Sequence, residues 1–123
     1  MYELKVKVHF DAAHHLVGYE GKCQRIHGHR WDVELALVGY RLDHLNMLVD
    51  FSTVKKELKG LIDGWLDHYD LNESLSENCP TAEYLAEWLF NSILASTSFS
   101  SLLTVNSVTI WESPECSITY SKP

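Results

Sequence analysis

The sequence predicts an α+β fold in which a four-stranded antiparallel sheet carries two helices on one face. Apolar and polar residues alternate near both ends of the chain, as they do in half-buried strands. The middle of the chain instead has apolar residues at helical spacing. The predicted order is strand, strand, helix, helix, strand, strand, without an internal repeat or a linker. We therefore expect residues 1–123 to form a single domain.

The strands follow from the alternation. Over positions 2–12 every second residue is apolar, which places these side chains on one face of a strand. Positions 29–38 repeat the pattern. Two shorter strands are expected at about 105–112 and 115–121, joined by a tight turn near Pro114. The two outer strands of such a sheet lack a partner, so we expect another subunit to cover these edges.

Two helices are predicted between the two pairs of strands. Apolar residues recur at helical spacing over 54–65 and again over 82–94. The residues that can cap the N-terminal ends are Asp50 or Ser52 for the first helix and Thr81 for the second. Residues 96–101 are expected to form a polar connection to the third strand.

The composition argues against several classes of function. The net charge is −7, whereas a nucleic-acid-binding protein carries a basic surface. No apolar stretch is long enough to span a membrane, and the first residues alternate in polarity, unlike a signal peptide. The cysteines are odd in number, which argues against a disulfide framework: Cys23, Cys79 and Cys116. We expect a cytoplasmic protein with free thiols that binds neither nucleic acid nor membrane.

Three of the seven histidines have the arrangement of metal ligands. His27 and His29 are two residues apart at the start of a strand, so both project from one face. Such a pair alone also occurs as unrelated surface histidines, but His14 adds a third inward-facing imidazole if the first strand stays extended. Three nitrogen ligands leave a fourth position open, as in catalytic zinc sites. The remaining histidines considered are expected to face solvent: His9, His15 and His44.

Four other residues are candidates for the chemistry. Cys23 is either a fourth ligand, which would make the metal structural, or a thiolate that acts as a general base. Asp67 and His68 form either a proton relay or a charge pair at a helix end. Glu112 is either an exposed strand-end carboxylate or a partner for the N–H donors of a ligand. The cations that could meet a small anionic substrate are Lys22, Arg25 and Arg30.

Taken together, these segments resemble the 6-pyruvoyltetrahydropterin / 6-carboxytetrahydropterin synthase family. They occur in the family's order over nearly the whole chain. The matching segments are Phe10-x-Ala12-Ala13-His14-x-Leu16, Gly21-Lys22-Cys23, His27-Gly28-His29, Val49-Asp50-Phe51, Leu66-Asp67-His68-x-x-Leu71-Asn72, Pro80-Thr81-x-Glu83 and Glu112.

The resemblance implies a tunnelling fold, in which the sheets of three subunits join into a barrel. Two such trimers stack into a homohexamer with active sites between subunits. The resemblance also implies a role for each candidate. Zinc would be held by His14, His27 and His29. Cys23 would be the base, Asp67 and His68 a relay donated by a neighbouring subunit, and Glu112 the anchor of the pterin ring.

The implied substrate is 7,8-dihydroneopterin triphosphate. One branch of the family eliminates triphosphate to give 6-pyruvoyltetrahydropterin. Another, in queuosine biosynthesis, loses triphosphate and acetaldehyde to give 6-carboxy-5,6,7,8-tetrahydropterin. Three residues separate Cys23 from His27, a compact spacing that resembles the carboxy-forming branch. We therefore expect a zinc-dependent carboxy-forming lyase; the alternatives are the pyruvoyl-forming enzyme and a non-catalytic zinc- or pterin-binding module.

Overall fold

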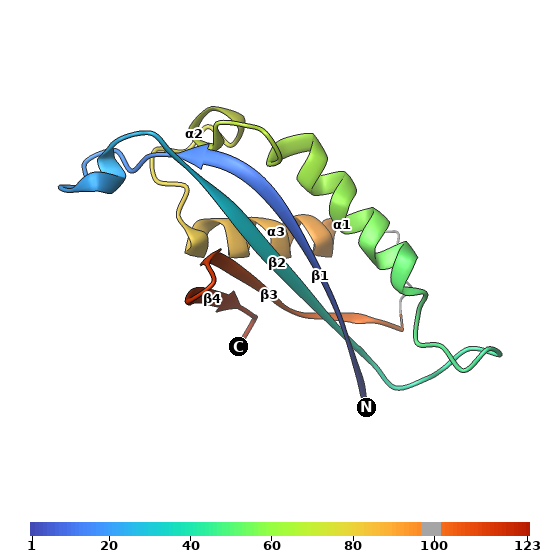
Figure 1. Ribbon diagram of the computed structural model, residues 1–123. Helices are drawn as coiled ribbons and strands as arrows, with labels where there is room; N and C mark the ends of the chain where they lie inside the picture. Colours follow the sequence, from blue (N-terminus) through green and yellow to red (C-terminus); the bar gives the residue numbers. More distant parts are fainter. Residues whose placement is uncertain (97–101) are drawn as a thin grey trace.

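Four antiparallel strands form one sheet in the order β1-β2-β3-β4 (Figure 1). The structure is a computed structural model that describes residues 1–96 and 102–123. The strands are β1 (Tyr2–His14), β2 (His27–Gly39), β3 (Thr104–Ser113) and β4 (Cys116–Tyr120). The predicted sheet is confirmed, and Pro114 lies in the turn between the last two strands. The predicted polar connection lies outside the described residues, apart from Ser96.

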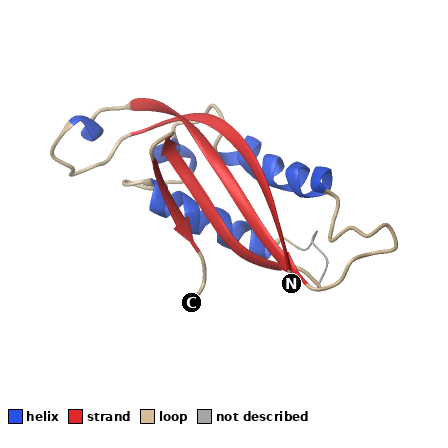
Figure 2. Ribbon diagram, turned by 60° about the horizontal axis from the view of Figure 1, so that its bottom comes forward, coloured by secondary structure: helices blue, strands red, loops and turns tan. Residues whose placement is uncertain are grey.

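The helices cover one face of this sheet (Figure 2). They are α1 (Phe51–Trp65), α2 (Leu71–Ser74) and α3 (Ala82–Ala95). The first packs near β1, and α3 packs against β3 and β4. Both long helices were predicted, whereas α2 and the 3-10 turn η1 (Lys22–Gln24) were not, because elements this short have no apolar period to detect. Among the described helices, none has both the length and the apolar character needed to cross a membrane.

Side-chain caps fix where the two long helices begin. Asp50, rather than Ser52, caps α1, because its carboxylate accepts a hydrogen bond from the Ser52 N–H at 2.8 Å. Thr81 caps α3 and accepts from the Tyr84 N–H at 3.2 Å. Each cap satisfies a backbone donor that the helix itself leaves without a partner.

The core lies between the sheet and the helices. Inward-facing residues of β1 and β2 meet the apolar stripes of α1 and α3, and most of these side chains are completely buried. Trp31 is the largest of them; it stacks on Phe10 and donates its indole N–H to the Ala12 carbonyl at 3.3 Å. The rings of His14 and His29 pack edge-on against Trp31. Buried apolar side chains of the core therefore pack directly against two of the histidines.

The segment that follows α1 pairs with the end of β1. The His68 N–H donates to the Asp11 carbonyl at 2.7 Å, and the Ala13 N–H donates to the Tyr69 carbonyl at 3.1 Å. A short parallel bridge joins Ala13 to Asp70. In the described part of the chain, no other segment pairs with the outer edge of β1, and none pairs with that of β4. Both edges are therefore available to another subunit.

Candidate metal centre

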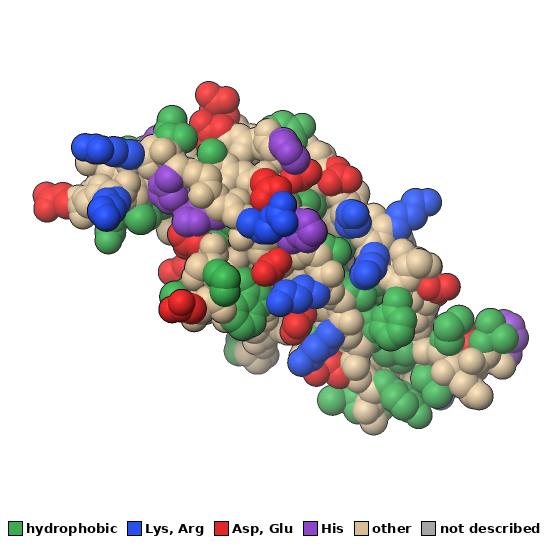
Figure 3. Space-filling view, in the orientation of Figure 1, with side chains coloured by type: hydrophobic (Ala, Val, Ile, Leu, Met, Phe, Trp, Pro, Cys, Tyr) green, Lys and Arg blue, Asp and Glu red, His purple; other side chains and the backbone are tan. Residues whose placement is uncertain are grey.

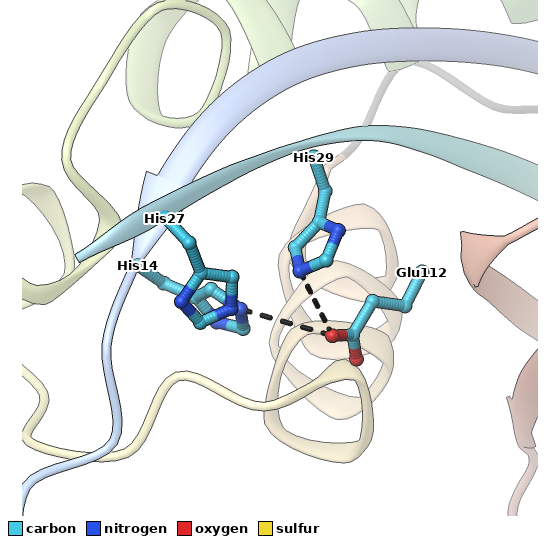
Figure 4. A group of neighbouring side chains, drawn as sticks. All are labelled: His14, His27, His29 and Glu112. Atoms are coloured by element: carbon cyan, nitrogen blue, oxygen red, sulfur yellow. Dashed lines mark ion pairs between the residues drawn. The ribbon is translucent and has the colours of Figure 1, made fainter. Parts of the chain in front are cut away.

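Three imidazoles and one carboxylate converge where β1 ends and β2 begins (Figure 4). His14 and His27 are direct partners in the β1–β2 ladder, and His29 follows on the same face of β2. Glu112, near the end of β3, completes the group. One ligand atom from each of the four side chains lies within 4.8 Å of the others. The alternation of the strands thus brings together the three histidines predicted from the sequence.

Backbone carbonyls orient two of the rings. His14 donates from Nδ1 to the Pro80 carbonyl at 2.9 Å, and His27 donates from Nδ1 to the Arg25 carbonyl at 2.7 Å. With the proton on Nδ1, the Nε2 lone pair is free. The Nε2 atoms of all three histidines are buried and form no hydrogen bond with the described residues. Converging nitrogens without a hydrogen-bond partner, two of them on rings whose other nitrogen is held by a carbonyl, fit a bound metal ion.

The electrostatics also suit a metal. Burial lowers the pKa of His14, against the opposing effect of its hydrogen bond with the Pro80 carbonyl, and the nearby His27 lowers this pKa further. Burial likewise lowers the pKa of His29, against the opposing effect of the Glu112 carboxylate. Lowered pKa values keep these imidazoles neutral near pH 7, the form that binds a metal ion.

Glu112 lies next to the histidines, a contact that its predicted role as the anchor of the pterin ring did not require. Its Oε1 atom is 3.0 Å from His29 Nε2 and 3.9 Å from His14 Nε2. The carboxylate can therefore act as a further ligand or turn toward a bound molecule. This proximity depends on how β3 is placed beside β2, which the alternation of β3 alone does not reveal.

Cys23 lies on η1, in the loop that joins β1 to β2. It is half-buried and free, and its thiol is not among the atoms that converge on the cluster. The Leu16 N–H donates to the Cys23 carbonyl at 2.7 Å, which ties the loop to the chain just after β1. Cys23 is therefore available as a thiol in this structure rather than placed as a fourth ligand.

Asp67 and His68 form a separate group beside the end of β1. Asp67 accepts the Asp11 N–H at 3.0 Å, and its other oxygen lies 3.0 Å from Nδ1 of His68. The Asp11 N–H lowers the pKa of Asp67, so this carboxylate stays ionised. His68 has a left-handed backbone (φ 63°) and a side chain that is 79% exposed. An exposed imidazole held by an ionised carboxylate is suited to transfer protons to a molecule bound from outside.

A hollow of about 530 Å³ is lined by His68 together with Asp11, His29 and Arg30. The Arg30 guanidinium contacts the Asp11 carboxylate through two hydrogen bonds of 3.0 and 3.2 Å. Of the three cations considered for an anionic substrate, Arg30 alone lines this hollow, and it is already paired. Lys22 and Arg25 are exposed on the loop around η1.

The other histidines and the residues around the site were only partly predicted from the sequence. His9 and His44 are exposed as predicted, but His15 is half-buried, so the prediction that His15 faces solvent was wrong. The chain leaves the strand at His15, and the Asn72 side chain binds both of its backbone groups. The alternation gave no sign that Asp11 contacts Asp67. The carbonyl of Pro80 has no sequence signal at all.

Comparison with known proteins gives consistent matches over the chain. A protein-family model described as 6-pyruvoyl tetrahydropterin synthase matches residues 3–123. A Synechocystis protein named 6-carboxy-5,6,7,8-tetrahydropterin synthase is 42% identical over 85 residues, which cover 66% of each chain. A Rickettsia conorii protein of the same name is 32% identical and covers 89% of this chain and 93% of its own. The structure of 6-pyruvoyl tetrahydropterin synthase from Caenorhabditis elegans matches with a TM-score of 0.85 at 26% identity, covering 99% of this chain and 96% of that one.

Proposed function

We propose, from the premise that the chain belongs to the 6-pyruvoyl tetrahydropterin synthase family, that it is a 6-carboxy-5,6,7,8-tetrahydropterin synthase of queuosine biosynthesis. This lyase converts 7,8-dihydroneopterin triphosphate and water to 6-carboxy-5,6,7,8-tetrahydropterin, with release of acetaldehyde and triphosphate. The observation that carries the proposal is the cluster of three inward-facing imidazoles, on a chain whose curated relatives bear this name.

The metal in this proposal is zinc, held by His14, His27 and His29. Three histidine nitrogens are a common ligand set of catalytic zinc, and in two of them, His14 and His27, a backbone carbonyl holds the other ring nitrogen. When bound, zinc supplies Lewis-acid polarisation of the substrate's side-chain oxygens, which makes neighbouring protons easier to remove.

The remaining roles belong to the protein's own side chains. Cys23 acts as the base that removes a proton from the substrate side chain. Glu112 accepts hydrogen bonds from the N–H groups of the pterin ring; its position beside His29 would keep the ring close to the metal centre. Asp67 orients His68, which exchanges protons with substrate bound at a neighbouring subunit. The side chain of His68 is 79% exposed, which supports a role toward substrate bound at a neighbouring subunit.

The proposed assembly is a homohexamer of two trimers, in which the free edges of β1 and β4 join into a barrel. The open edges and the match to a solved relative over nearly its full length support this arrangement. Residues 1–123 are proposed to form one domain. The free cysteines among the described residues support a reducing, cytoplasmic location.

A second candidate is the pyruvoyl-forming reaction, which the family description and the C. elegans structure favour. The names of the curated relatives and the short spacing from Cys23 to His27 favour the carboxy-forming reaction. A non-catalytic zinc- or pterin-binding module would not require Cys23, Asp67 and His68 together.

Parallel substitutions of Cys23 and His29 test the metal and the base separately. We expect Cys23→Ala to retain zinc and to lose about 10²- to 10⁴-fold in turnover of 7,8-dihydroneopterin triphosphate, the usual contribution of a general base. We expect His29→Ala to lose zinc. Cys116→Ala, at an exposed cysteine on β4, is the matched control and should change neither quantity. If Cys23→Ala loses zinc together with turnover, Cys23 is a ligand and the proposed mechanism fails.

A further inference from the structure

The side chain of Asn72 joins two segments that meet at the metal centre. Its Oδ1 atom accepts the His15 N–H at 3.0 Å, and its Nδ2 group donates to the His15 carbonyl at 2.9 Å. The same Nδ2 group donates to the Asn78 carbonyl at 3.1 Å. The amide therefore pairs with His15 as a neighbouring strand would, and it also holds a third segment in place.

The backbone of Asn72 is itself fixed. Its N–H donates to the capping carboxylate of Asp70 at 3.1 Å, and its carbonyl accepts the Glu77 N–H at 3.1 Å. Asn72 sits in the first turn of α2, directly after the segment that pairs with β1. Because its backbone is held on both sides, its side chain can transmit this fixed position to the residues it binds.

Both segments held by Asn72 lead to His14. His15 is the next residue in the chain, so fixing its peptide groups fixes the backbone of His14. Two residues after Asn78, the carbonyl of Pro80 accepts the Nδ1 proton of His14 at 2.9 Å and so leaves Nε2 free to face the cluster. His14 itself is only 2% exposed, so its ring has little other freedom.

The same contacts also reach the loop that carries Cys23. The Leu16 N–H, one residue after His15, donates to the Cys23 carbonyl at 2.7 Å. The Val17 N–H donates to the Asn78 carbonyl at 3.1 Å, the same oxygen that Asn72 binds. One side-chain amide thus ties the metal-ligand strand, the carbonyl behind His14 and the Cys23 loop into one unit.

We propose that Asn72 is a positioning residue of the metal centre, which orients the His14 imidazole and holds the Cys23 loop through these contacts. The proposal rests on the proposed function only in taking zinc as the ion bound by the histidines. It requires an amide: a carboxylate keeps the acceptor for the His15 N–H but brings negative oxygen toward two carbonyls and donates to neither.

The test measures zinc affinity by competition with a chromophoric chelator, and the alkylation rate of Cys23 by peptide mass spectrometry. We expect Asn72→Asp to lower zinc affinity by about tenfold or more, as is usual when a partner behind a metal ligand is lost. We also expect faster alkylation of Cys23, because the loop is released. Asn91→Asp, the same change at an exposed position of α3, should leave both quantities unchanged.

A lower melting temperature with wild-type zinc affinity in Asn72→Asp would overturn the proposal and reduce Asn72 to a residue that stabilises the fold. If Asn72→Asp does not fold, Asn72→Ser keeps one donor and undergoes the same measurements, and wild-type zinc affinity there overturns the proposal equally. Failure of the wild-type protein to bind zinc would overturn the proposed function and this proposal together, and so differs from a failure confined to the variants.

Discussion

At the scale of single residues, the three histidines of the cluster differ in burial. The side chain of His14 is 3% exposed and that of His29 is 27% exposed. His14 also packs against the indole of Trp31 and donates to a backbone carbonyl. His14 is therefore part of the core as well as a candidate ligand, whereas His29 lies at the rim.

This difference predicts that His14→Ala and His29→Ala have unequal effects on the metal-free protein. We expect His14→Ala to lower the free energy of unfolding by about 2 kcal/mol, because it leaves a cavity and an unpaired Pro80 carbonyl. His29→Ala should lower it by less than about 1 kcal/mol. Urea unfolding in the presence of a chelator measures both. Equal losses would contradict the role of His14 in the core.

Asp67 gives a pH-dependent prediction. The Asp11 N–H lowers its pKa below the ordinary 3.8, so ionised Asp67 stabilises the folded state above that pH. This stabilisation is lost as the pH falls from 3.8 through the lowered pKa, because the folded state then takes up the proton less readily than the unfolded state. At pH 7, Asp67→Asn keeps an acceptor for the Asp11 N–H but loses the negative charge, so it should reduce the free energy of unfolding by less than about 1 kcal/mol.

The difference between wild type and Asp67→Asn should therefore shrink as the pH is lowered toward 3. Chemical unfolding of both proteins across this range provides the measurement. A difference that stays constant with pH would show that the charge on Asp67 contributes nothing to the fold.

At the scale of elements, the loop between β1 and β2 places Cys23. Gly21 begins the turn η1 with φ 143°, a conformation that side chains rarely adopt. A Cβ atom there would lie 3.0 Å from the Tyr19 ring. A side chain at this position would therefore shift the loop and the thiol that it carries.

We predict that Gly21→Ala reduces turnover at least tenfold while zinc remains bound, because the loop carries the thiol whereas the ligands lie on strands. Turnover and zinc content measured on the same preparation test this. Gly60→Ala is the control: it lies within α1 with open space around the added methyl group and should raise stability by about 0.5–1 kcal/mol without changing activity. Loss of zinc in Gly21→Ala would contradict the separation of loop and ligands.

Some features of the strands and helices could be predicted from sequence patterns, and others could not. The alternation in β1 and β2 predicted the inward faces and thus His14, His27 and His29, because a period of two assigns every side chain to a face. The capping candidates, Asp50 or Ser52 for α1 and Thr81 for α3, predicted where these helices begin, and the structure selects Asp50. The contacts of Glu112, Asp11 and Asn72 were not predictable. They depend on the register between strands and on the path of irregular segments, and the spacing of apolar residues within one segment does not reveal either.

At the scale of the whole molecule, two features favour assembly. In the described part of the chain the outer edge of β4 is open, and that of β1 is open except near its end, where Ala13 pairs with Asp70. Figure 3 shows hydrophobic side chains gathered at the end of the molecule that contains the loop before α1. A hollow of about 410 Å³ is lined by residues of β1, of the loop before α1 and of α1, and its large exposed side chains are Tyr2, Leu42 and Phe51. Exposed apolar surface of this kind commonly marks a subunit contact.

A shared active site predicts complementation between two inactive variants. Cys23→Ala and His68→Ala should each lack activity alone. After the two are mixed, dissociated and reassembled, some sites combine an intact Cys23 from one subunit with an intact His68 from its neighbour, so activity should return. The assay is turnover of the reassembled mixture, with each variant reassembled alone as the control. Continued inactivity of correctly sized mixed oligomers would place both residues of each site in one chain.

The reaction itself is tested most directly by the identity of its product. The zinc-loaded protein is incubated with 7,8-dihydroneopterin triphosphate, and the pterin product and released aldehyde are identified by mass spectrometry. The proposal predicts 6-carboxy-5,6,7,8-tetrahydropterin together with acetaldehyde. A 6-pyruvoyl product without acetaldehyde would contradict the carboxy-forming reaction and support the pyruvoyl-forming alternative, and no conversion with zinc still bound would contradict both.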